Sequence, residues 1–323
     1  MKRMRLFLLL GLSMLAPLAA TAQGSYPDKP LKLVVGFTAG GPTDIVGRVM
    51  AQHLGDRLGK PMVVDNRAGA AGSIGAAYVA KTPADGYTLY LAVQTTHAVA
   101  PYLYPSPGYD PIKDFTGVGR VVHNPLVMVV HPSLPANNLA ELVAYIKANP
   151  GKLSYATGGS GSSPHMSMEM FKRAAGLDIT PIHYKGDSAA MADFLSGRVN
   201  MMMSSISGHM TNIQSGKVRA IALSGPTRSG RLPDVPTIAE SGYPGFEVLT
   251  WFGLVVPAKT PPEIVARLNR ETLAVLNQPD VREQFTKMGF EIVPSSPRDF
   301  TAYLAEEANR WGGLIRTLGI KAD

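Results

Sequence analysis

The sequence predicts an α/β protein built of two lobes, with a ligand cleft between them. Apolar, β-branched runs alternate with helical patterns along the chain, which is typical of mainly parallel sheets flanked by helices. Two Gly-rich loops, far apart in the sequence, each follow a strand-like run and precede a helix that begins near a proline. Between residues 118 and 130 the apolar pattern lengthens, and Asn124-Pro125 interrupts it, which we interpret as the first crossover between lobes.

These observations divide the chain. We expect a first lobe made of residues 23–123 and 226–323, a second lobe made of residues 124–225, and hinges near 122–126 and 224–226. Open α/β sheets bind ligands beyond the carboxyl ends of their strands, so loops that follow strands should meet at the cleft.

The first lobe begins with the clearest alternation of strands and helices. We expect strands at 31–37, 62–65, 88–93 and 251–256, and helices at 42–58 and 73–81. Pro42 suits the first turn of its helix, because its missing N–H would have had no helical partner there.

The second lobe repeats this pattern. We expect strands at 153–157, 179–184, 199–204 and 218–224, and helices at 139–148, 164–175, 189–195 and 209–214. Pro164 opens the second of these helices in the same way as Pro42 opens its own.

Two long helices are expected to close the chain and to join the lobes. Thr260-Pro261-Pro262-Glu263 supplies an N-cap, a first-turn proline and a capping-box glutamate, and Ser296-Pro297-Arg298-Asp299 does nearly the same. Ile264, Leu268, Val275 and Leu276 form an approximate core-facing stripe on the first of them.

The amino terminus has the pattern of a secretory signal peptide. Lys2, Arg3 and Arg5 precede a short apolar run at 6–18, and Ala20-Thr21-Ala22 supplies the small residues of a cleavage site. The run is shorter than the roughly 20 residues that span a bilayer, which argues against a membrane anchor. We therefore expect residues 1–22 to be a signal peptide cleaved after Ala22, and the mature protein to be periplasmic.

Composition limits what the mature protein does. Removal of Lys2, Arg3 and Arg5 lowers the formal net charge from +7 to +4, and the remaining Lys and Arg residues are scattered, so we expect no nucleic-acid partner. Cysteine is absent, which excludes a lipoprotein anchor and means that a packed core must stabilise the fold without disulfides.

The first Gly-rich loop is a candidate anion site. A helix start presents backbone N–H groups that have no helical partner, and Gly40 and Gly41 would let a ligand approach the backbone closely. Thr38 and Thr43 add hydroxyls, and Asp44 is interpreted as support for the helix start rather than as a catalytic acid. The candidate ligand-binding residues of this loop are Phe37, Thr38, Ala39, Gly40, Gly41, Thr43 and Asp44.

The second loop has the same design in the other lobe, so an anionic ligand would be held from both sides. Several hydrogen bonds to a charged group, at about 1.5–3 kcal/mol each, suffice for a micromolar complex without a buried cation. The alternative is that both loops are merely tight turns. The candidate residues here are Thr157, Ser160, Ser162, Ser163 and His165.

Other residues that follow strands are expected to reach the cleft. Lys185 could offer a charge to a carboxylate, although a solvated lysine is an equal alternative. His97 more often shapes a helix start than acts as a base, and Trp251 could equally belong to the core. The candidates are Thr95, His97, Tyr184, Lys185, Ser204 and Trp251.

Signatures of enzymes and metal sites are weak. The loop at 158–162 lacks the last glycine of a nucleophile elbow, and no P-loop or HExxH motif occurs. Methionines at 166–170 and 201–203 could suit Cu(I), but Met commonly fills core gaps. We expect no catalytic residues, no metal and no cofactor.

The chain also resembles a known family through separated motifs that occur in order between Tyr26 and Ile320. These are Gly40-Gly41-Pro42-Thr43-Asp44, Val63-Val64-Asp65-Asn66-Arg67 with the loop 69–75, Asp85-Gly86-Tyr87-Thr88-Leu89, Asn124-Pro125-Leu126-Val127, Pro150-Gly151-Lys152-Leu153, Tyr184-Lys185-Gly186, Leu232-Pro233-Asp234-Val235-Pro236-Thr237, Trp251-Phe252-Gly253-Leu254 and Arg310-Trp311-Gly312. Together they resemble the tripartite tricarboxylate transporter substrate-binding proteins, the Bug or TctC family of periplasmic receptors.

The resemblance implies a type II-like periplasmic-binding-protein fold that closes on a small organic carboxylate and delivers it to membrane permease subunits. It implies a monomer, and a role as a signalling receptor for a sensor kinase is an alternative. A periplasmic hydrolase or lyase that uses Asp44, His97 or Lys185 is a further one.

The sequence departs from the family pattern at three places. Ala39 replaces a common proline, Asp187 replaces a frequent small residue, and Met203-Ser204-Ser205 stands where an aspartate is often found. Loss of that aspartate argues against amino-acid ligands and favours di- or tricarboxylates, or aromatic carboxylates.

Overall fold

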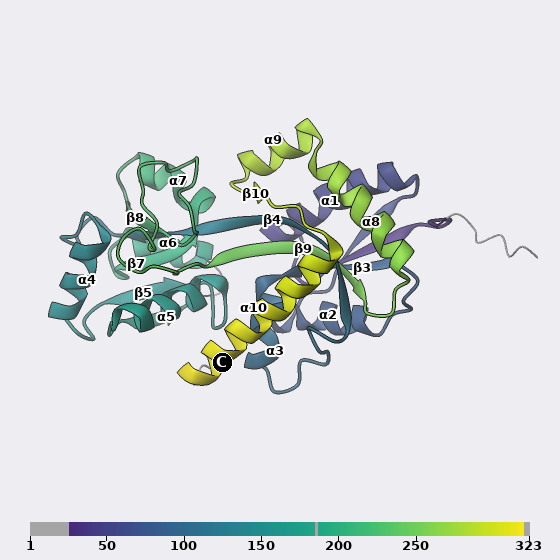
Figure 1. The fold of residues 1–323 in the computed structure, drawn as a ribbon. Coiled ribbons are helices and arrows are strands. Elements are labelled where there is room, and N and C mark those ends of the chain that lie inside the picture. Colours follow the sequence, from purple (N-terminus) through teal and green to yellow (C-terminus); the bar gives the residue numbers. More distant parts are fainter. Residues whose placement is uncertain (1–25, 185–186, 320–323) are drawn as a thin grey trace, which may run out of the picture.

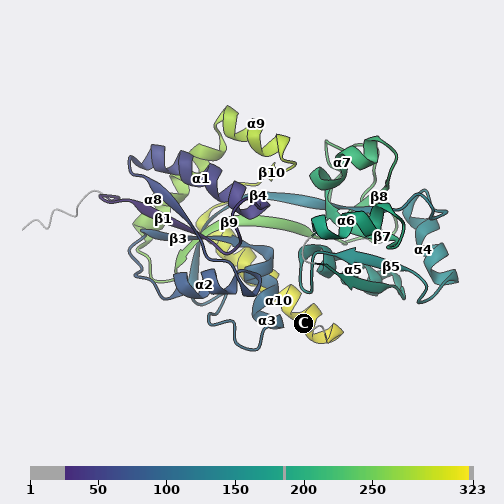
Figure 2. The ribbon, with the colours of Figure 1, turned by 180° about the vertical axis from the view of Figure 1, so that it is seen from behind.

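The computed structural model describes residues 26–184 and 187–319, and it has two lobes joined by two long strands (Figures 1 and 2). These strands are β4 (Phe115–Val130) and β9 (Leu249–Pro257), which run antiparallel to each other. The predicted two-lobed α/β fold is therefore confirmed. In the part of the chain that is described, no helix is long and apolar enough to cross a membrane.

The first lobe contains a mixed sheet in the order β2-β1-β3-β9-β4. The strands β1 (Leu31–Val35), β2 (Met62–Asn66) and β3 (Thr88–Val93) are parallel, whereas β9 pairs antiparallel with β3. The short strand β10 (Glu291–Ile292) pairs with β4. The helices of this lobe are α1 (Pro42–Leu58), α2 (Ser73–Ala80), α3 (Ala100–Leu103), α8 (Pro262–Leu276), α9 (Pro279–Lys287) and α10 (Pro297–Leu318), with short turns η1 (Ala70–Gly72) and η2 (Thr95–Val99).

The second lobe continues the sheet from the far half of β4. There β4 pairs antiparallel with β7 (Met201–Ser205) and β8 (Arg219–Leu223), and β5 (Ser154–Thr157) pairs parallel with β7 and with β6 (Thr180–His183). The helices are α4 (Leu139–Ala148), α5 (Ser163–Ala175), α6 (Asp187–Leu195) and α7 (Ile206–Gln214). The sheets are parallel at their outer strands and antiparallel where the chain crosses between lobes.

At Asn124-Pro125, where we interpreted the interrupted apolar pattern as the first crossover, β4 runs on without a break. Asn124 and Pro125 are opposite Thr250 and Leu249 of β9, whereas Leu126 onwards pairs with β7. The proline lies where β4 changes partners, and a missing ladder hydrogen bond costs least at such a place.

The return to the first lobe also comes later than we expected. Leu232 and Val235 pack in a core cluster with Leu223 of β8, and Thr237 bridges to Leu223 as well. Residues 226–248, assigned from the sequence to the first lobe, thus cover the second lobe, and β9 is the strand that returns.

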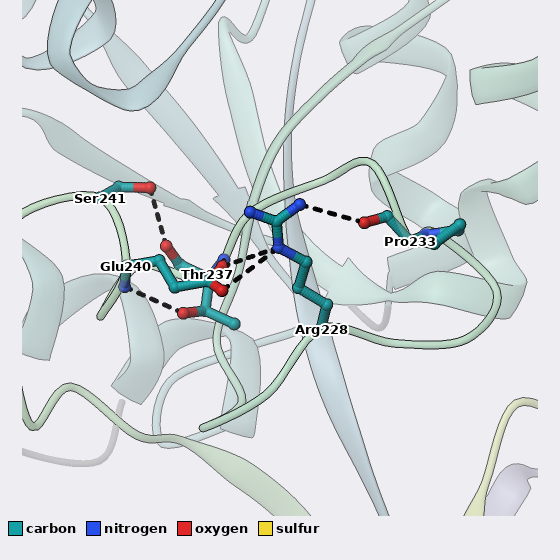
Figure 3. A network of polar contacts seen from close by, with 5 residues as sticks. All are labelled: Arg228, Pro233, Thr237, Glu240 and Ser241. Atoms are coloured by element: carbon teal, nitrogen blue, oxygen red, sulfur yellow. Dashed lines mark hydrogen bonds and ion pairs between the residues drawn. The ribbon is translucent and has the colours of Figure 1, made fainter.

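A polar network fixes the shape of this returning segment (Figure 3). The Nε of Arg228 donates to Oε2 of Glu240 at 2.9 Å, and the same oxygen accepts the N–H of Thr237 at 2.8 Å. The Thr237 hydroxyl in turn accepts the N–H of Glu240 at 3.0 Å, which is the reciprocal pattern of a capping box.

Helix α10 connects the lobes on one side of the molecule, as expected for the last helix (Figure 1). Its buried Glu307 accepts hydrogen bonds from Nε1 of Trp251, at 2.9 Å, and from Nε1 of Trp311, at 3.0 Å. Farther out, Arg310 reaches Met170 of α5 in the second lobe. The other expected closing helix ends at Leu276, and α9, which we did not expect, follows after Asn277-Gln278.

Candidate ligand-binding cleft

A cavity of ≈ 530 Å³ lies between the lobes, at the carboxyl ends of the strands. Its walls come from the α1 loop and the β9 and β10 region on one side, and from the starts of α5 and α7 on the other. The crossing strands β4 and β9 supply Asn124, Leu126 and Thr250 between these walls. This size falls in the roughly 300–1,000 Å³ range of sites for small molecules.

The first Gly-rich loop meets the cavity with its two ends but not with its middle. Phe37, Pro42 and Thr43 line the cavity, whereas Thr38, Ala39 and Gly40 are exposed and are not among its lining residues. Gly41 is the half-buried residue before the helix. The first in-helix hydrogen bond is donated by Ile45 to Gly41, so the N–H groups of the preceding helix residues lack helical partners.

The carboxylate of Asp44 organises this loop from inside. It accepts hydrogen bonds from the N–H of Gly40 at 2.9 Å, from Nε of Arg48 at 2.7 Å and from Nδ2 of Asn66 at 2.9 Å. Burial opposes its ionisation, but these hydrogen bonds outweigh burial and lower the pKa of Asp44 to about 2. The N–H of Gly40, which we expected to face a ligand, is therefore engaged by Asp44.

The second loop is shaped by its own hydrogen bonds. The Ser162 hydroxyl caps α5 by accepting the N–H of His165, and Nδ1 of His165 accepts the N–H of Gly161 at 3.0 Å. The buried hydroxyl of Thr157 accepts the N–H of Gly159 at 3.0 Å. Thr157 and His165 thus hold the loop, while Ser162 and Ser163 line the cavity.

A hydrogen bond joins the two lobes at the cleft. The Ser163 hydroxyl donates to Oε1 of Gln94 at 2.5 Å, and both residues are buried. Gln94 follows β3 and directly precedes Thr95, which lines the cavity. Sequence reasoning found Thr95 but missed Gln94, although the position directly after a strand was the same signal.

Asn124 is a second residue that sequence reasoning missed at the site. It lines the cavity from β4, and its Oδ1 is buried with no hydrogen-bond partner among residues 26–184 and 187–319. Its place at the crossover, which the sequence did mark, could have pointed to it. A buried polar atom of this kind would be satisfied by a ligand group or a water molecule that reaches it.

Several expected site residues lie elsewhere. His97 and Thr95 are two positions apart in the helical turn η2, so they point to different sides, and His97 packs fully buried against Phe115. Trp251 is a core residue bound to Glu307, and the hydroxyl of Tyr184 donates to Asp193. Ser160 and Ser204 are not among the residues that line the cavity, and Lys185 lies outside the described residues.

The described residues contain no cluster of side chains that could bind a metal ion. In those two ranges, no three His, Cys, Asp or Glu side chains gather as they would around a metal ion. Met166, Met168 and Met201–203 are buried in the cores of the second lobe.

The lobes also touch at Gly161, which gives a test of their contact. Gly161 has φ +73°, and a Cβ added there would lie 2.1 Å from Cδ1 of Leu103 in α3 of the first lobe. Gly161→Ala should lower the free energy of unfolding by about 2 kcal/mol, because the end of the Leu103 side chain must move aside and this cost adds to backbone strain. Urea unfolding measures this difference.

Gly176→Ala is the matched control, because Gly176 has φ +62° and nothing within 4 Å of an added Cβ. It should cost only about 1 kcal/mol of backbone strain. Equal losses in the two variants would contradict a tight contact between the lobes at Gly161.

Two α/β lobes with a ligand-sized cavity between them are the architecture of the periplasmic solute-binding proteins. The sequence profile of the tripartite tricarboxylate transporter family receptor (TctC) matches residues 46–320, and the chain belongs to this family. Protein BugT of Bordetella pertussis is 39% identical over 94% of this chain and 93% of its own length.

Solved structures agree with this assignment. An R. palustris protein with adipate has 36% sequence identity and a TM-score of 0.80, over 92% of this chain and 100% of its own. MatC from Rhodopseudomonas palustris with bound malate has 33% identity and a TM-score of 0.76, over 90% of this chain and 100% of its own. The family consists of receptors rather than enzymes.

Proposed function

We propose that this protein is a periplasmic receptor that closes its two lobes on a small organic carboxylate and delivers it to the permease subunits of a tripartite tricarboxylate-type transporter. The observation that carries this proposal is the single cavity lined by Thr43 at the start of α1 and by Ser162 and Ser163 at the start of α5. Each helix start favours an anion, and the two come from opposite lobes.

The relatives support the same ligand class, since one was solved with adipate and another with malate. Lobe closure would bend the crossing strands β4 and β9, and the Ser163–Gln94 bond would form only when the lobes are close. Residues 1–22 would direct export and be removed after Ala22, and the mature protein would act as a monomer.

Mass spectrometry of the protein purified under native conditions from its own periplasm tests the ligand class. We expect an organic acid to be released on unfolding, and the same acid to raise the melting temperature of the ligand-free protein. Failure of every acid in a broad panel to stabilise a correctly folded sample would overturn the proposal.

The intact mass of the same sample tests export, because cleavage after Ala22 would leave a chain that starts at Gln23. A mass that includes residues 1–22 would contradict the expected cleavage. Co-purification with the permease subunits tests the transport role, and binding to a sensor instead would favour a signalling receptor.

A further inference from the structure

The two walls of the cavity differ in chemistry. On the first lobe, Phe37, Phe252, Met288 and Phe290 belong to one apolar cluster, and Ile45 of α1 lines the cavity beside them. The rings of Phe252 and Phe290 pack edge to face with centroids 5.3 Å apart. The first lobe therefore offers an apolar wall, defined here as Phe37, Ile45, Phe252, Met288 and Phe290.

The second lobe offers mainly hydroxyls, whereas Thr43 and Thr95 are the hydroxyl residues of the first lobe in this cavity. Ser162 and Ser163 stand at the start of α5, and Ser205 and Ser207 stand at the start of α7. Asn124 adds an amide beside them. A molecule that satisfies both walls must be polar on one side and apolar on the other.

Charge limits how anionic that molecule is. Among the described residues that line the cavity, none is Asp, Glu, Lys, Arg or His. Countercharge comes from the starts of α1, α5 and α7, each equivalent to roughly +0.5 elementary charge, and the Asp44 carboxylate in the first turn of α1 offsets part of it. From the described residues alone, the remaining charge of about +1 balances one carboxylate but leaves a tricarboxylate poorly compensated.

We propose that the ligand of this cavity is a monocarboxylate with an apolar body, aromatic or aliphatic, whose carboxylate lies between Thr43 and the serines of α5 and α7 and whose body lies on the apolar wall. This inference rests on the proposed carboxylate-receptor function and names the class of acid. A second carboxylate on such a body would be placed against Phe252 and Phe290, whose side chains offer no hydrogen-bond donor.

Calorimetric titration of the ligand-free protein with five acids tests the inference. Hexanoate and adipate share a six-carbon chain and differ by one carboxylate, while phenylacetate, acetate and citrate vary the body and the charge. We expect hexanoate and phenylacetate to bind at least about tenfold more tightly than acetate, adipate and citrate, a difference of about 1.4 kcal/mol.

Tighter binding of adipate or citrate than of hexanoate and phenylacetate would overturn the inference while leaving the carboxylate-receptor function intact. Binding of none of the five acids would overturn the inference, whereas the receptor function would be overturned only if the broad panel of acids also failed.

A pair of variants locates the apolar body. Ile45→Lys places a cation on the apolar wall, at a side chain that is already 38% exposed, and should shift the ratio of adipate to hexanoate affinity toward adipate at least tenfold. Ile74→Lys makes the same change on α2, at a 55% exposed side chain outside this cavity, and should leave the ratio unchanged. Equal ratios in both variants, with melting temperatures that show folded protein, would contradict the placement of the body.

Discussion

Asp44→Asn is expected to weaken ligand binding about tenfold and to lower the free energy of unfolding by about 2 kcal/mol, because hydrogen bonds to a charged group contribute about 1.5–3 kcal/mol each. The Asp44 carboxylate ties together the Gly40 N–H, Arg48 and Asn66. An amide has one acceptor oxygen for these donors, and its NH₂ group would face other donors. The loop before α1 would then lose its fixed shape, although Asp44 itself does not line the cavity.

Asp299→Asn is the matched control. Asp299 is also a first-turn carboxylate, but it is exposed on α10, where its N–H and one oxygen bond with the Ser296 hydroxyl. This variant should change stability by at most about 0.5 kcal/mol, as usual for surface positions, and should not change affinity. Calorimetry measures the ligand affinity of both variants, and urea unfolding measures their stability. An Asp44→Asn protein with unchanged affinity would show that Asp44 does not position the loop for the ligand.

The sequence predicted most of the elements because their signals are local. The helices at 42–58 and 139–148 and the strand at 88–93 have the predicted bounds. At these places prolines, glycines or caps mark an end and the apolar pattern sets the period. Ser162, which we expected to face a ligand, also caps α5.

Long-range pairing was not predictable in the same way. Asn124-Pro125 reads locally as a break, but β9, more than a hundred residues later, pairs with β4 across it. Residues 226–248 carry no strand or helix pattern that reveals which lobe they cover, and only their packing on Leu223 decides it.

In the site, too, the residues placed by local structure could be predicted from the sequence, and those placed by tertiary structure could not. Ser162, Ser163 and Thr43 line the cavity because they stand at helix starts, which the sequence marks. Gln94 and Asn124 reach the site through the relative placement of two lobes, and His97 turns away through the helical geometry of η2. None of these orientations follows from spacing alone.

Two buried histidines should make the fold sensitive to acid. Burial lowers the pKa of His97 to about 3 and the pKa of His209 to about 4, whereas an unfolded histidine titrates near 6.5. The stability from keeping both neutral is fully present above pH 6.5 and is lost as the pH falls toward 4 and then 3, because only the unfolded chain takes up the protons. We expect the free energy of unfolding to fall by about 2 kcal/mol for each histidine between pH 7 and pH 5.

The variant His209→Leu isolates the contribution of His209 to the loss of stability in acid. In the described part of the chain, neither ring nitrogen of His209 has a hydrogen-bond partner, and the ring packs against Phe194. Leucine should therefore raise the free energy of unfolding at pH 7 by about 1 kcal/mol and remove about 2 kcal/mol of the loss between pH 7 and pH 5. Met210→Leu, at the neighbouring half-buried position of α7, removes no titratable group and should keep the full loss. Urea unfolding at the two pH values measures all three proteins, and equal acid losses in His209→Leu and the unaltered chain would mean that His209 is not held neutral by the fold.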